Sequence, residues 1–72
     1  MKVKLFASLR EGRFKEKEWE YVKGITVSHI LGKLNINKVE VGALLVNSLH
    51  VGPDYTLQED DILAVFPVLG GG

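Results

Sequence analysis

Residues 62–72 read ILAVFPVLGGG and decide the fold, because a nearly continuous apolar run meets three glycines at its end. Such a run is typical of a central strand that is buried on both faces of a sheet. Pro67 has no N–H to give to a neighbouring strand, so we expect regular pairing to fail there. Glycine packs no side chain and loses much backbone entropy on ordering, so the last three residues add little to a fold. We therefore predict a strand over residues 62–68 that leaves the sheet through Leu69.

The rest of the chain has the periodicities of a sheet and one helix. Period-two alternation and short apolar runs predict strands over residues 2–7, 17–22, 41–47 and 49–51. Apolar residues recur at helical spacing from Val27 to Leu34, after Thr26 or Ser28 as the capping residue. The order is strand, strand, helix, strand, short strand, strand. One helix must then cover one face of a mixed sheet whose last strand is central, which predicts an α+β fold of the β-grasp (ubiquitin-like) type.

Length and composition limit the function. Seventy-two residues form one small domain, and a core of this size rarely encloses a catalytic pocket, so we expect a carrier, a subunit or a binding module and no enzyme. Nine basic residues balance nine acidic ones without a basic block, which argues against nucleic acid as a partner. No apolar run approaches the length of a membrane span or the core of a signal peptide. We expect a cytoplasmic protein that does not enter a membrane.

Four stretches of the sequence together resemble the MoaD/ThiS family of sulfur carriers. They are KLFASLRE at residues 4–11, the Val46 and Asn47 pair, the acidic turn at residues 59–61, and FPVLGGG at residues 66–72. The resemblance covers essentially the whole chain and is closer to the MoaD branch. It supports the β-grasp prediction and implies that the C-terminal glycines take part in a reaction.

The resemblance implies that Gly72 is the reactive residue. In the family, an adenylating enzyme related to ubiquitin activators uses ATP to activate the carboxylate of the last glycine, which then becomes a thiocarboxylate. The sulfur is delivered on a larger, MoaE-like synthase subunit that makes molybdopterin or tungstopterin. Gly71 would precede the reactive residue and Gly70 would lengthen the arm. The chain itself would bind no cofactor, because the activating enzyme uses the ATP.

A bare glycine tail suits this chemistry. Without a Cβ, the last residue crowds neither the attack on ATP nor the later attack on its acyl carbon. We expect a β-grasp domain over residues 1–69 and a flexible tail over residues 70–72. Counted from Leu69, the last four residues reach roughly 13 Å when fully extended.

A docking surface should lie beside the tail. If Leu63 and Val65 point at the helix, alternation places Phe66 on the opposite, open face. Phe66 is the predicted interface anchor. We expect Phe6, Pro67, Val68 and Leu69 to complete the partner-binding surface.

Three alternatives remain open. A ubiquitin-like modifier joined to lysines through Gly72 would begin with the same adenylate. A sulfur carrier could equally serve thiamine synthesis or tRNA thiolation. A binding module with a passive tail would keep its function without Gly71 and Gly72. No metal site is expected, because His29 and His50 lack partners at ligand spacing.

Overall fold

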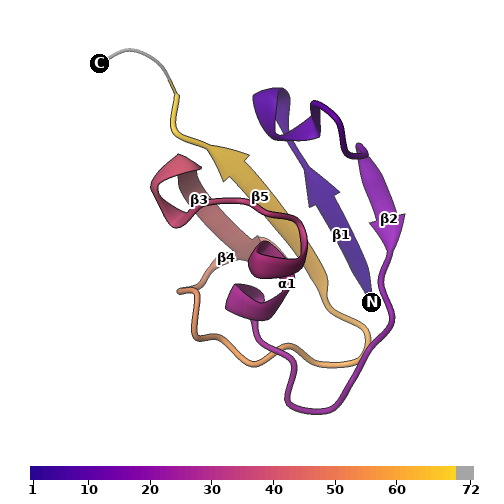
Figure 1. Cartoon of the computed structure of the whole chain (residues 1–72). Helices are drawn as coiled ribbons and strands as arrows, with labels where there is room; N and C mark the ends of the chain where they lie inside the picture. The colour runs from indigo at the N-terminus through magenta and orange to yellow at the C-terminus, as the bar shows by residue number, and fades with distance from the viewer. Residues whose placement is uncertain (70–72) are drawn as a thin grey trace.

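A computed structural model describes residues 1–69, and the predictions made for Gly70, Gly71 and Gly72 lie outside these residues. Eight elements follow in order: β1 (Lys2–Leu5), η1 (Ala7–Arg10), β2 (Glu16–Glu18), α1 (Val27–Lys33), η2 (Lys38–Glu40), β3 (Val41–Val46), β4 (Leu49–His50) and β5 (Ile62–Pro67). The five strands form one sheet in the order β2-β1-β5-β3-β4. Strand β5 pairs with β1 in parallel and with β3 antiparallel. Helix α1 covers one face of this mixed sheet, as predicted for a β-grasp fold (Figure 1).

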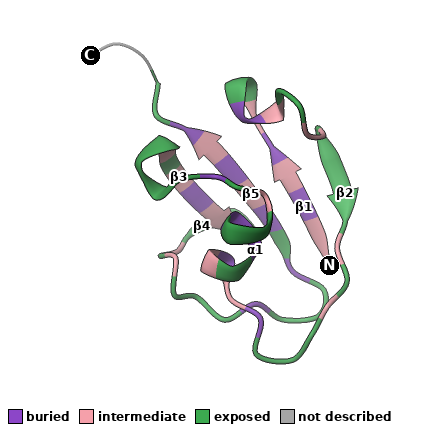
Figure 2. Cartoon of the chain, in the orientation of Figure 1, coloured by how far each residue is buried: buried purple, intermediate pink, exposed green. Residues whose placement is uncertain are grey.

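The core lies between α1 and the inward face of the sheet. Side chains on β5 alternate, so that Leu63 and Val65 are buried whereas Ala64 and Phe66 are half-buried (Figure 2). Val27, Ile30 and Leu31 supply the apolar face of α1. Of the two predicted capping residues, Thr26 and Ser28, it is Thr26 that caps the helix, because its Oγ1 accepts the His29 N–H at 3.2 Å.

Strand β5 is central, but the prediction that both of its faces are buried was wrong. Among residues 1–69, the one α-helix lies on the other face, so no element covers the second face of the sheet. That face is charged at one end, where Lys2 and Lys4 lie opposite Glu18 and Glu16. It is apolar at the other end, near the last residues of β5.

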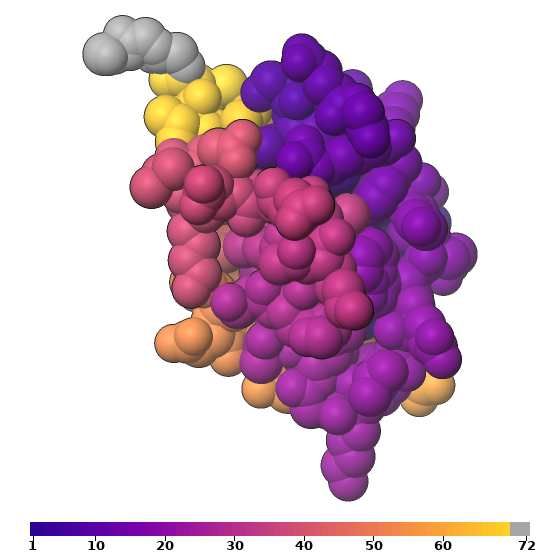
Figure 3. Space-filling view, viewed as in Figure 1, coloured from indigo at the N-terminus to yellow at the C-terminus, as the bar shows by residue number. Residues whose placement is uncertain are grey.

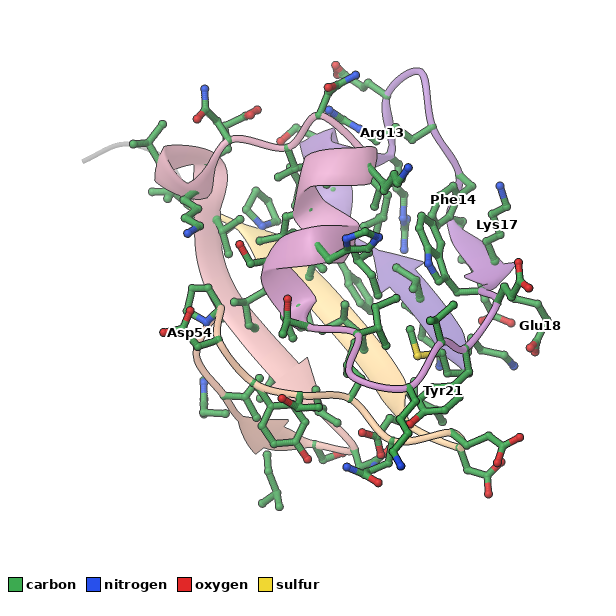
Figure 4. All side chains as sticks on the ribbon, turned by 60° about the horizontal axis from the view of Figure 1, so that its bottom comes forward. Arg13, Phe14, Lys17, Glu18, Tyr21 and Asp54 are labelled. Carbon is green, nitrogen blue, oxygen red and sulfur yellow. The ribbon has the colours of Figure 1, made fainter. Side chains whose placement is uncertain are left out.

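Strand β2 is shorter than the predicted segment 17–22. Glu18 pairs with Lys2, the first residue of β1, and Trp19 still bonds to Met1, through its N–H at 2.8 Å and its carbonyl oxygen at 3.4 Å. No residue of β1 lies opposite residues 20–22, so the pairing ends there. Trp19 and Tyr21 pack against the edge of the core instead. The Lys17 ammonium lies 5.7 Å from the Phe14 ring centroid and 5.8 Å from that of Trp19, on the β2 side of the molecule (Figure 4).

Candidate functional site

Two aromatic rings mark the open face at the C-terminal end of β5. Phe6 follows β1 and its N–H donates to the carbonyl oxygen of Val65 at 3.2 Å, which aligns it with Phe66. The two rings stack with their centroids 4.2 Å apart and their planes at 10°. Alternation correctly placed both residues on this face. The structure shows in addition that they form one contact.

Arg10 fixes one side of this aromatic pair. Its Nε donates to the Leu5 carbonyl oxygen at 2.7 Å, and its Cζ lies 5.3 Å from the Phe6 ring centroid. The short helix η1 thereby places a permanent cation beside the rings. Sequence patterns did not single out Arg10, because its position depends on the 3₁₀ turn that follows Phe6.

Apolar side chains continue from the stacked rings to the last described residues. Val68 is 60% exposed and Leu69 is 83% exposed. A shallow hollow of about 400 Å³ is lined by Gly42, Ala43, Leu45, Phe66, Pro67 and Leu69. In the space-filling view, the end of β5 and the residues after it lie between η1 and the start of β3 (Figure 3). We call Phe6, Phe66, Val68 and Leu69 the exit surface.

Pro67 departs from the prediction that it extends the exposed apolar surface. It is buried, because it follows Leu63 and Val65 on the inward side of β5 and only lines the floor of the hollow. The missing N–H of Pro67 loses no hydrogen bond to β1. The acceptor it would face on that ladder is the Phe6 carbonyl oxygen, and this oxygen already accepts the Leu9 N–H at 3.2 Å.

Pairing with β3 becomes irregular beside Pro67, as the proline predicted. Ala43 pairs with Phe66 and Val41 with Pro67, which leaves Gly42 as an extra residue in a β-bulge. Past the bulge, the Val68 N–H donates to the Glu40 carbonyl oxygen at 2.9 Å. At residue 68 the chain is therefore still hydrogen-bonded to the segment that leads into β3.

Three comparisons with known proteins bear on this site. The model of the ThiS family matches residues 3–72. The chain belongs to the ThiS family. The resemblance to MoaD/ThiS sulfur carriers drawn from the sequence is thereby confirmed. A search of curated proteins returned no significant match.

Two solved structures resemble this ThiS-family chain along nearly its whole length. One is the crystal structure of SAMP1 from Haloferax volcanii, at 23% identity and a TM-score of 0.73, covering 99% of this chain and 97% of that one. The other, described as molybdopterin converting factor subunit 1, is from Pyrococcus furiosus. It has 30% identity and a TM-score of 0.72, and the match covers 94% of this chain and 95% of that one. The β-grasp fold is thereby confirmed.

Two of the other motif residues of this ThiS-family chain, Asn47 and Asp61, hold the fold together. Asp61 is only 6% exposed, and its carboxylate accepts from Asn47 Nδ2 at 2.8 Å and from the Gln58 N–H at 2.7 Å. Asn47 Oδ1 accepts the Ile62 N–H at 3.0 Å, so the β3–β4 turn is tied to the start of β5. These residues lie at the opposite end of β5 from the exit surface.

Within residues 1–69, no group of three His, Asp or Glu side chains is arranged to hold a metal ion. Over the same residues, no helix has the length and apolar character needed to cross a membrane. The exit surface, with its stacked rings and its exposed Val68 and Leu69, is the candidate functional site of this ThiS-family chain.

Proposed function

We propose that the chain is a sulfur carrier whose Gly72 carboxylate is adenylated and converted to a thiocarboxylate, as the small subunit of a molybdopterin synthase. One observation carries the proposal: an exposed apolar surface lies where the chain leaves the sheet towards its terminal glycines. Membership of the ThiS family and the similarity to a protein described as molybdopterin converting factor subunit 1 support it. The chain would carry the reacting group for its partners and catalyse no step itself. Because activation consumes ATP, we place it in the cytoplasm.

The reaction has two steps. A carboxylate oxygen of Gly72 attacks the α-phosphate of ATP, which forms an acyl adenylate and releases pyrophosphate. Hydrosulfide then attacks the acyl carbon and displaces AMP, which leaves the thiocarboxylate. The ATP and the sulfur source would be held by the activating enzyme, and this chain supplies a carboxylate without a Cβ beside it.

The exit surface would dock the carrier on its partners. Phe6 and Phe66 offer stacked rings at its centre, and aromatic residues in such positions commonly dominate interface energies. Arg10 adds a cation at its rim that suits a carboxylate on the partner. A ubiquitin-activator-like adenylating enzyme and a MoaE-like large subunit would use this surface in turn, since both must receive the same tail.

The test is conversion of the full chain in a reconstituted system. The chain is incubated with ATP, an activating enzyme and a sulfur source, and its intact mass is measured before and after. Replacement of one oxygen by sulfur at Gly72 is the expected result, and a variant without Gly72 is the control. Failure of the full chain to react with any activating enzyme related to ubiquitin activators would refute the proposal.

The same samples separate the remaining alternatives. Transfer of sulfur to a precursor in the presence of a MoaE-like subunit supports the molybdopterin pathway, whereas transfer only to thiamine or tRNA acceptors assigns another one. Covalent adducts on lysines in a cell lysate, lost when Gly72 is deleted, would indicate a protein modifier.

A further inference from the structure

The chain leaves the sheet through an arrangement of backbone contacts that the docking surface does not explain. Val68 N–H donates to the Glu40 carbonyl oxygen at 2.9 Å, after the bulge at Gly42. Glu40 ends η2, where its carboxylate accepts the Asn37 N–H at 2.9 Å and its own N–H donates to the Asn37 carbonyl at 2.9 Å. Two short helices, η1 and η2, lie on either side of this point (Figure 1).

Gly42 is required by close approach and not by an unusual backbone angle. A Cβ built on Gly42 would lie 2.5 Å from the Pro67 carbonyl oxygen, 2.9 Å from its carbonyl carbon and 3.0 Å from the Val68 Cα. All three atoms belong to the backbone, so no change of side-chain rotamer can relieve the overlap. Any side chain at residue 42 must therefore push residues 67 and 68 away from β3.

We propose that Gly42 and the Glu40 carbonyl form a tail anchor, which positions the C-terminal residues for activation by holding Val68 on the sheet. This inference rests on the proposed function, because it assigns the anchor a role in the reaction of Gly72. With the anchor formed, four residues follow Val68 and reach at most roughly 13 Å. With the anchor released, the Ala43 and Phe66 pair is the last one left, and six residues reaching roughly 20 Å follow it.

The anchor should affect turnover more than docking. The exit surface loses no aromatic ring when Gly42 is replaced, so the carrier still binds its activating enzyme. Once released, residues 67 and 68 must be ordered each time the carboxylate approaches ATP, and this ordering lowers the chain entropy. In the wild-type chain the anchor has already ordered them, so the reaction step does not carry that loss. We expect kcat for adenylation to fall by roughly tenfold with KM for the carrier nearly unchanged.

The test compares Gly42→Ala with Gly52→Ala in the full chain. Gly52 is a matched control, because a Cβ there meets nothing within 4 Å. Amide hydrogen exchange of Val68, followed by NMR without any partner, reads the anchor directly. It should become at least roughly tenfold faster in Gly42→Ala, whereas the Leu63 and Val65 amides keep their protection and Gly52→Ala behaves as wild type. Steady-state adenylation kinetics then give kcat and KM for each variant.

A second variant guards against loss of the fold. Glu40→Ala removes only an exposed carboxylate that holds η2, so it should change Val68 exchange and kcat in the same direction but by less. Unchanged Val68 exchange in Gly42→Ala would overturn the anchor, and unchanged kcat despite faster exchange would overturn its role in positioning. If the wild-type chain is never adenylated, the proposed function fails, and Val68 exchange still reports on the anchor itself.

Discussion

Replacing Asp61 with alanine should destabilise the fold strongly. The buried carboxylate accepts two hydrogen bonds, from Asn47 Nδ2 at 2.8 Å and from the Gln58 N–H at 2.7 Å. Through Asn47, which accepts the Ile62 N–H at 3.0 Å, it also holds the β3–β4 turn against the start of β5. Alanine removes the acceptor and leaves two donors without a charged partner.

The expected loss follows from these two bonds. A hydrogen bond to a charged group contributes about 1.5–3 kcal/mol. Asn47 and Gln58 are exposed, so water can replace part of each bond, and we take the lower end, which gives about 3 kcal/mol in total. At about 4–8 °C per kcal/mol for a domain of this size, the melting temperature should fall by about 12–24 °C. Urea and thermal unfolding followed by circular dichroism measure both quantities.

The neighbouring Asp60 supplies the control. Asp60→Ala removes the same charge from an exposed position and should change the free energy of unfolding by about 0.5 kcal/mol or less. Asp61→Asn keeps the shape of the side chain and one acceptor oxygen. Its loss in the free energy of unfolding should therefore lie between those of the two alanine variants. Equal losses for Asp61→Ala and Asp60→Ala would refute the assignment of this carboxylate to the fold.

Three further outcomes are expected. Arg13 (Figure 4) donates to the Leu34 and Asn35 carbonyl oxygens at the end of α1, at 3.0 and 3.3 Å, and to the Leu9 carbonyl oxygen of η1 at 3.1 Å. Arg13→Ala should therefore cost about 2 kcal/mol in urea unfolding, and Arg13→Lys should recover little of it. Under the proposed function, Phe66→Ala should raise the KM of the activating enzyme for the carrier at least roughly tenfold and leave kcat nearly unchanged. An unchanged KM would exclude Phe66 as the anchor of docking. A hydrogen bond from Lys2, at 3.1 Å, and its charge lower the pKa of Glu16 from its ordinary value of 4.5. The ion pair therefore stabilises the fold at neutral pH and is lost as the pH falls through the lowered value, and NMR titration of Lys2→Met should find the Glu16 pKa raised towards 4.5.

Local patterns predicted the parts of the fold that depend on which face a residue occupies. Alternation at Leu63, Val65 and Phe66 identified the two faces of β5, because burying one face fixes the register of a strand. The helix cap was predicted to be Thr26 or Ser28, and Thr26 is the one observed, since capping depends on residues within one turn.

What could not be predicted depends on contacts between distant parts of the chain. The end of β2 at Glu18 is set by where β1 begins, which the aromatic residues after it do not reveal. The bulge at Gly42 exists because another strand's backbone comes close, and a glycine in an apolar run gives no sign of that. Arg13 reaches carbonyls more than twenty residues away, so its role at the end of α1 has no local signature.

The stacking of Phe6 on Phe66 has a consequence for protein synthesis. The two rings are sixty positions apart in the sequence, and they meet only after β5 has inserted between β1 and β3. During translation β5 is made after the other four strands, so a chain truncated before it lacks three of the four residues of the exit surface. Long-range pairing of this kind forms late and as a unit. Under the proposed function, an activating enzyme that binds these rings would select completed, folded carriers and would leave unfinished chains without an adenylate.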